Sequence, residues 1–262
     1  MSAAFVMFAQ TIAPKKCNTC GKPLAQCQYK GRHPNPAASE KPAKQRTQAA
    51  KPVQPSKPTA GYLNGHEWVD LGLPSGTKWA TMNVGASSPS DYGNYYAWGE
   101  TSPKSSYEWS NLKYRLSGNT EDNVKMYKYV TDSRYGTVDG KKKLELSDDA
   151  AYVNWGSGWR MPTYAEFKEL VINCSCKWTS LNGHNGYDIV GPNGNCIFLP
   201  AAWCKGIKLF DRLGEAGSYW CSTKFVEDNL CADGIYFDEM LFSKTCSSYY
   251  RYNGRSVRPV IE

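Results

Sequence analysis

The residues best suited to chemistry occur near the start of the chain, where three cysteines and one histidine lie close together. Their spacing is C-x2-C-x6-C-x5-H, formed by Cys17, Cys20, Cys27 and His33. Three thiolates and one imidazole complete a tetrahedral Zn2+ site, and in a segment with almost no apolar core the metal would supply the folding energy. We therefore predict a zinc-knuckle-like motif over residues 11–35. Two alternatives stay open, a disulfide between the first two cysteines in an oxidising compartment and free thiols.

A second set of candidate residues lies near the end of the chain, where residues 224–252 are rich in Tyr, Ser, Asp and Cys. Tyrosine supplies rigid amphipathic contact area and serine supplies adaptable hydrogen bonds, a combination typical of antibody paratopes. The alternative is a static surface strand that happens to be rich in tyrosine. We predict a ligand-binding face formed by Tyr236, Asp238, Tyr249, Tyr250 and Tyr252.

Residues for catalysis do not form a recognisable pattern. Apart from His33 in the Cys/His motif, the histidines are His66 and His184, and neither occurs in a Ser/His/Asp arrangement or in a paired metal motif. The carboxylate pairs Asp148–Asp149 and Asp238–Glu239 are adjacent in sequence, so their side chains diverge on a helix or strand and do not by themselves form a glycosidase pair. We predict no catalytic residue and expect that the protein is not an enzyme.

The formal net charge of +7 over 262 residues belongs to the N-terminal quarter of the chain. Residues 1–60 hold ten Lys/Arg and one Asp/Glu (+9), whereas residues 61–262 hold 21 and 23 (−2). A nucleic-acid-binding domain clusters basic residues on a folded face, so we expect no specific nucleic-acid partner. No apolar run reaches the roughly 18 residues that a transmembrane helix needs, so we do not expect an integral membrane protein.

The elements that must position these residues begin with two segments of unusual composition. Residues 1–10 are apolar and end in small residues, which favours a truncated signal peptide; the alternative is an ordinary apolar N-terminus. Residues 36–60 are rich in Pro, Lys, Ala and Gln, and their one β-branched apolar residue is Val53. Such a segment buries too little surface to offset its ordering entropy, so we predict a disordered linker.

Residues 61–262 contain one clear helical pattern, Thr163–Ile172. Thr163 is a suitable N-cap and Glu166 follows it at capping-box spacing. A weaker helix is predicted over Ser147–Trp155. We predict short strands at Trp68–Leu71, Lys78–Thr81, Tyr95–Trp98, Tyr187–Val190, Cys196–Leu199, Tyr219–Ser222 and Gly234–Phe237. The fold class is therefore α+β, with short strands, one or two helices and much irregular loop.

Packing expectations follow from two phrases. In GSYWCS, Tyr219 and Trp220 should face opposite sides of a strand. In GRSVRPV, Val257 and Val260 should point inward, while Arg255 and Arg258 should pair with carboxylates. We also expect five tryptophans to serve as core anchors: Trp79, Trp98, Trp155, Trp159 and Trp220.

Several ordered phrases carry a family resemblance. They include EWVDLGLPSGTKWA at Glu67–Ala80, DDAAYVNWGSGWR at Asp148–Arg160, and MPTYAE, IFLPAA, GSYWCS and GRSVRPV farther along. Together they resemble the Fibrobacter succinogenes major paralogous domain, which is common in secreted Bacteroidetes proteins. The resemblance implies that residues 61–262 form one C-type-lectin-like domain. The Cys3His phrase, with its GKP, recurs beside such domains.

The end of the chain also resembles the variable region of lectin-fold proteins that retroelements diversify, which likewise closes on RxxGxSVRPV. Both resemblances imply a ligand-binding or adhesion module, secreted or associated with the cell envelope (periplasm or cell surface), whose partner is an unknown protein or glycan on a cell surface. Two other functions stay open. WRMPTYAEF is similar to formylglycine-generating-enzyme-like domains, although their C-terminal cysteine motif is not matched, and a purely structural envelope protein is the third reading.

Overall fold

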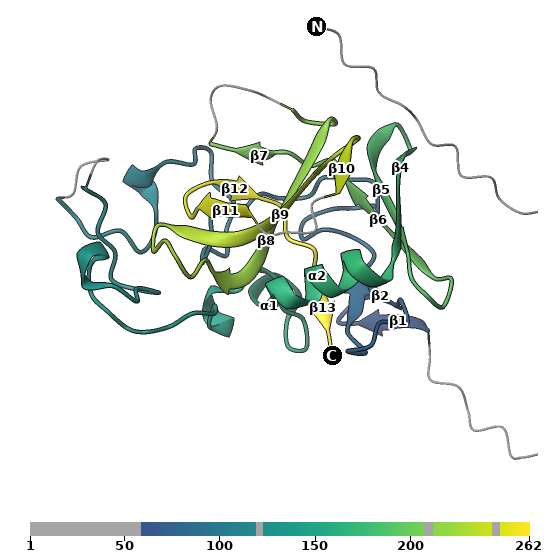
Figure 1. The fold of residues 1–262 in the computed structure, drawn as a ribbon, viewed down its shortest axis with the longest axis horizontal. Helices are drawn as coiled ribbons and strands as arrows, with labels where there is room; N and C mark the ends of the chain where they lie inside the picture. Colours follow the sequence, from purple (N-terminus) through teal and green to yellow (C-terminus); the bar gives the residue numbers. More distant parts are fainter. Residues whose placement is uncertain (1–58, 119–122, 207–211, 243–246) are drawn as a thin grey trace, which may run out of the picture. The chain divides into compact units, whose positions relative to one another are not determined.

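A computed structural model describes residues 59–118, 123–206, 212–242 and 247–262, all within a unit that spans residues 55–262. The predicted signal peptide (1–10), the Cys/His motif (11–35) and the linker (36–60, except its last two residues) lie outside the described residues. The described part consists mostly of antiparallel sheets with two α-helices (Figure 1), which confirms the α+β class.

One four-stranded sheet joins the two ends of the described unit. Its order is β1 (Ala60–Leu63), β2 (His66–Asp70), β3 (Lys78–Ala80) and β13 (Val260–Ile261). Asn64 and Gly65, with φ of 50° and 82°, connect the first two strands, as expected for the Asn-Gly turn of a tight hairpin. The last strand pairs Val260 with Trp79, so the start and the end of the domain form one structure.

The central sheet separates two parts of the core. It contains β8 (Ala216–Lys224), β9 (Cys231–Asp238), β10 (Leu241–Phe242) and β11 (Ser247–Tyr250), with β9 paired to the other three. Tyr219 packs into one hydrophobic cluster, with Phe167 and Phe237, while its neighbour Trp220 packs into a second cluster on the other side. The expected alternation of these two aromatic residues is therefore confirmed.

Smaller strands complete the domain. A three-stranded meander contains β4 (Ser175–Leu181), β5 (His184–Val190) and β6 (Cys196–Pro200), and a short pair joins β7 (Cys204–Lys205) to β12 (Gly254–Arg255). Between β3 and α1 the described residues form long irregular loops that include the 3-10 turns Trp109–Asn111, Ser133–Tyr135 and Leu146–Asp148. A third hydrophobic cluster lies under these loops and includes Tyr107, Met126 and Val130.

The two helices form where the sequence indicates, with one change of boundary. Helix α2 (Tyr164–Asn173) has Thr163 as its N-cap, and Glu166 completes the predicted capping box. Helix α1 (Ala150–Trp155) begins later than predicted, because Asp149 is its N-cap and accepts hydrogen bonds from the amides of Ala151 and Tyr152. The residues before it form the separate 3-10 turn that ends at Asp148.

One predicted strand is wrong. Residues Tyr95–Trp98 contribute only an isolated bridge between Tyr96 and Arg255. Two residues farther on, the amide of Trp98 donates to the carbonyl of Arg251, so the chain leaves the strand path after a single pair. The segment instead packs into the core, since Tyr96, Ala97 and Trp98 are all buried.

The predicted ion pairs of the last arginines are also wrong. Arg258 is fully buried and donates to Asn83 Oδ1 and to the carbonyls of Ala80, Thr81 and Phe198 at 2.8–3.1 Å. Arg255 is buried with its guanidinium 3.4 Å from the ring centre of Tyr249. The valines do point inward, and all five named tryptophans are buried. These arginines therefore tie loops together through backbone oxygens and ring faces.

Candidate functional site

The predicted binding residues fall into two groups, and the first group surrounds Arg212. Tyr236 and Asp238 lie two positions apart on β9, so their side chains share one face of the strand. Arg212 donates to the hydroxyl of Tyr236 and to Asp238 Oδ2, the latter at 3.3 Å, while the tyrosine donates to the same carboxylate at 2.7 Å. Burial would raise the pKa of Asp238, but the hydrogen bonds from Tyr236 and Arg212 lower it below its usual value.

A pocket of about 410 Å³ opens beside this trio. Its walls come from β4, β5, the turn before β8 and the end of β9, and they include Trp178, Asn185, Glu215, Glu239 and Met240. Met240 is 95% exposed at the tip of the β9–β10 hairpin. The polar trio is thus accessible from solvent, and its charges are already paired within the protein.

The second group is aromatic. Tyr250 and Tyr252 stack with ring centres 5.7 Å apart and an angle of 15° between their planes. Trp109, from a 3-10 turn far away in sequence, lies 4.7 Å from Tyr252 and 5.5 Å from Tyr250 with its plane tilted against both. Tyr250 is 48% exposed. We call these three side chains the aromatic platform.

Tyr249 belongs neither to the trio around Arg212 nor to the aromatic platform. It is half-buried, packs edge-on against Trp220 and covers the guanidinium of Arg255. The five predicted residues therefore do not form one continuous face. The sequence analysis missed Arg212 and Trp109, and for neither does the sequence hold a signal: the first lies in a turn and the second in a long loop without a strand or helix pattern.

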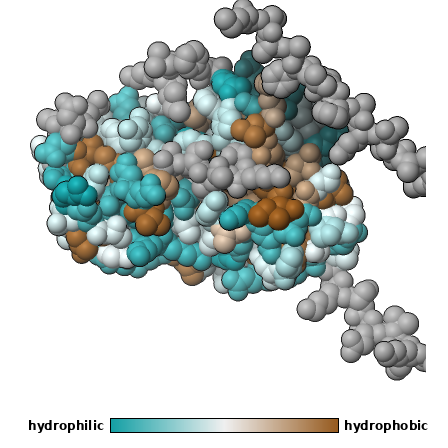
Figure 2. Space-filling view, in the orientation of Figure 1, coloured by the Kyte–Doolittle hydropathy of each residue, from teal (hydrophilic) through white to brown (hydrophobic). Residues whose placement is uncertain are grey.

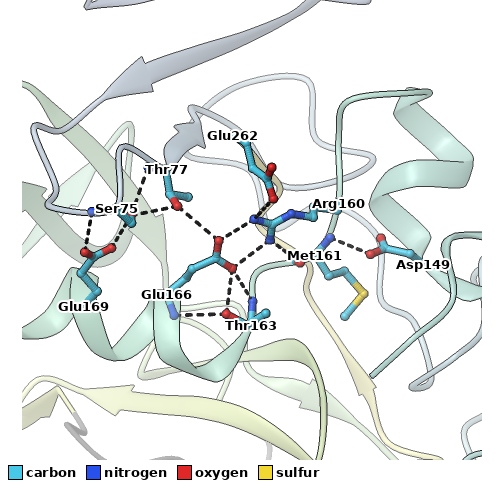
Figure 3. Close-up of polar contacts among 9 residues, drawn as sticks. All are labelled: Ser75, Thr77, Asp149, Arg160, Met161, Thr163, Glu166, Glu169 and Glu262. Atoms are coloured by element: carbon cyan, nitrogen blue, oxygen red, sulfur yellow. Dashed lines mark hydrogen bonds and ion pairs between the residues drawn. The ribbon is translucent and has the colours of Figure 1, made fainter. Parts of the chain in front are cut away.

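The WRMPT phrase forms a separate polar network around the start of α2 (Figure 3). Arg160 donates to both oxygens of Glu166, at 2.8 and 2.6 Å, and the same carboxylate accepts from the amide of Thr163 at 2.7 Å. Burial would raise the pKa of Glu166, but these donors lower it to about 2. Thr77 also donates to it, at 3.2 Å. The carboxylate joins α2 to the loop before β3 through Thr77 and to the segment before α2 through Arg160 and Thr163.

The carboxylate of Asp149, beside this network, also accepts several hydrogen bonds from backbone amides. It accepts from the amide of Met161 at 2.8 Å while it caps α1, and burial raises its pKa. An open pocket of about 400 Å³ lies next to Arg160, lined by Leu63, Leu146, Trp159 and Ile261 among others. Because each carboxylate here is held by several donors, we assign the network to folding.

Two thiols and one buried amine among the described residues have clearly shifted pKa values. Burial raises the pKa of the Cys174 and Cys231 thiols to about 12. Lys224 is 3% exposed, and burial together with the nearby Arg251 lowers its pKa to about 8. Its ammonium donates to the carbonyl of Phe225 at 2.9 Å.

The predicted zinc ligands Cys17, Cys20, Cys27 and His33 lie outside the described residues. Within the ranges that the structure does describe, no group of three or more His, Cys, Asp or Glu side chains is arranged to hold a metal ion. No helix in that part of the chain is both long enough and apolar enough to cross a membrane.

Hydrophilic side chains cover most of the face shown in Figure 2, and apolar ones form separate small patches. The aromatic platform and the trio around Arg212 are the candidate contacts that the predicted binding residues form. Comparison of the chain with protein families, with curated proteins and with solved structures found no match.

Proposed function

We propose that the chain is a ligand-binding or adhesion protein, secreted or held in the cell envelope, that contacts a protein or glycan on a cell surface. The observation that carries this proposal is the aromatic platform, in which Tyr250 and Tyr252 stack, Trp109 packs against both at a steep angle, and Tyr250 is about half exposed. Large aromatic side chains of this kind dominate the energetics of interfaces because they bury much area with few rotatable bonds.

A binding role agrees better with the described side chains than an enzymatic one. The carboxylates around Arg160 and Arg212 are held by several donors each. The thiols of Cys174 and Cys231 have raised pKa values, whereas a catalytic thiol needs a lowered one. We therefore favour binding over chemistry of the formylglycine-generating type.

The resemblance to retroelement-diversified proteins also supports a binding role for the C-terminal region of the chain. A buried arginine lies between the two platform tyrosines in sequence: Arg251 is about 1% exposed, whereas Tyr250 is 48% exposed. A constant framework that carries replaceable surface residues would have this arrangement. We propose that variation, where it occurs, falls on the tyrosines and spares the arginines.

The test is a mixed array of oligosaccharides and cell-surface proteins probed with the full chain. The Tyr250→Ala/Tyr252→Ala double variant should lose the array signal, and Tyr62→Ala should keep it, since Tyr62 is 73% exposed on β1. Tyr249 is left unchanged because it covers a buried guanidinium. Thermal melting must show that all three proteins are folded. No signal from the wild-type chain, or an unaltered signal from the folded double variant, would overturn the proposal.

A further inference from the structure

The shape of the aromatic platform restricts what it can bind. The three ring centres are 4.7, 5.5 and 5.7 Å apart, which places the rings in direct contact with one another. An aromatic cage for a quaternary or lysine ammonium needs rings that stand apart so that the cation enters between them. Because these rings already touch, the platform offers ring faces and edges on its outer side and no enclosed box.

The platform is also fixed from below. Trp109 and Tyr252 are partly buried and pack on the third hydrophobic cluster, whose buried members include Tyr107, Leu112 and Val130. Tyr250 extends from the end of β11, where it pairs in register with Cys231 of β9. A ligand therefore meets preorganised rings, which reduces the ordering cost of binding.

The surroundings of the platform are polar. Glu108 and Ser110 flank Trp109 and are exposed, and none of the three platform residues lines either of the two pockets described above. A protein partner gains most of its binding energy by inserting an apolar anchor into a desolvated pocket. A flat ligand that has C–H groups on its faces and hydroxyls on its rim fits rings with polar margins better.

We infer that the aromatic platform binds the pyranose rings of neutral oligosaccharides by stacking. This inference rests on the proposed binding function and specifies its ligand class. A pyranose presents axial C–H bonds from one face, and these are attracted to the negative face of an aromatic ring. Since Tyr250 and Tyr252 are stacked and Tyr250 is 48% exposed, a sugar would contact the exposed side of Tyr250.

The experiment titrates the full chain with soluble tetrasaccharides of neutral hexose and of N-acetylhexosamine, followed by calorimetry and by tryptophan fluorescence. We expect at least one tetrasaccharide to bind. We expect Tyr250→Ala to weaken that binding about tenfold, Tyr250→Phe to preserve it because the ring remains, and Tyr62→Ala to leave it unchanged. Trp109→Ala should weaken binding further and abolish the fluorescence change.

The outcomes separate this inference from the proposed function. If the wild-type chain binds proteins on the array but none of the tetrasaccharides, the saccharide inference is overturned and the binding function stands. If a tetrasaccharide binds and folded Tyr250→Ala binds it equally well, the platform is not the site. If the chain binds neither class, both proposals fail.

Discussion

The guanidinium of Arg160 donates to both oxygens of Glu166, and the same carboxylate completes the capping box at the start of α2. One side chain thus completes an ion pair and a capping box together, and a third donor, Thr77, reaches it from the loop before β3. The residue that the sequence marks as a local helix signal is therefore also a long-range connection in the domain.

Replacing this carboxylate should destabilise the domain. Glu166→Gln removes the charge partner of Arg160 and weakens the cap, and we expect the free energy of unfolding to fall by about 2 kcal/mol. Urea denaturation at neutral pH measures it. Glu262→Gln is the matched control, because Glu262 meets the same guanidinium at 3.3 Å but its side chain is 87% exposed; its change should be close to zero. Equal effects in both variants would contradict the prediction.

The Arg160–Glu166 pair should also make the free energy of unfolding depend on pH in the acidic range. The pKa of Glu166 is about 2 in the folded protein, against an ordinary value of 4.5. A lowered pKa gives stability that is complete above pH 4.5 and is lost as the pH falls towards 2. The wild-type and Glu166→Gln unfolding free energies should therefore converge between these two pH values. A difference that stays constant down to pH 2 would show that the carboxylate's ionisation makes no contribution.

Buried Lys224 should make the free energy of unfolding depend on pH in the alkaline range. Burial and Arg251 lower its pKa to about 8, while Asp228, Asp233 and Cys231 oppose the shift. Between pH 8 and its ordinary value of 10.5 the unfolded chain binds the proton more tightly, so this group makes stability rise with pH.

Lys224→Met removes that contribution. Subtracting its unfolding curve from the wild-type curve should leave a difference that rises from pH 8 to pH 10, because the contributions of buried tyrosines and thiols cancel. Lys143→Met, at an exposed position, should give a flat difference. A flat difference for Lys224→Met as well would refute the prediction.

Arg258 should tolerate no substitution, even by lysine. Its planar group supplies donors to four oxygens on two separate segments, residues 80–83 and Phe198, and an ammonium at a single point cannot reach them all. Unpaired carbonyls left in the interior are costly, so Arg258→Lys should lose about 3 kcal/mol of unfolding free energy. Arg134→Lys, whose side chain is 80% exposed, is the control and should change little. Chemical denaturation of both variants measures the two changes, and a loss for Arg258→Lys as small as that for Arg134→Lys would contradict the prediction.

Local signals in the sequence predicted local structure well. The capping box of α2 was predicted because Thr163 and Glu166 lie three residues apart and satisfy each other. The opposite orientation of Tyr219 and Trp220 follows from the two-residue period of a strand. Both depend on neighbours along the chain, which the sequence displays directly.

Long-range partners could not be predicted in this way. Arg258 was expected to meet a carboxylate because charge suggests an opposite charge, yet its acceptors are carbonyls brought from β3 and β6 by the fold. Tyr250 and Tyr252 were identified from composition, but Trp109 joins them from a loop that has no periodic pattern. The sequence therefore indicated the two tyrosines of the candidate site. The contribution of Trp109 depends on a tertiary contact that the sequence does not reveal.

The pairing of Val260 with Trp79 has a consequence for synthesis in the cell. Strand β3 is made early, but its neighbour β13 leaves the ribosome only after about 180 further residues have been translated. Until then one edge of β3 has no strand partner, and unpaired edges recruit other chains. Folds with such distant pairings also form slowly. The nascent domain should therefore be most prone to aggregation in the interval before β13 closes this edge.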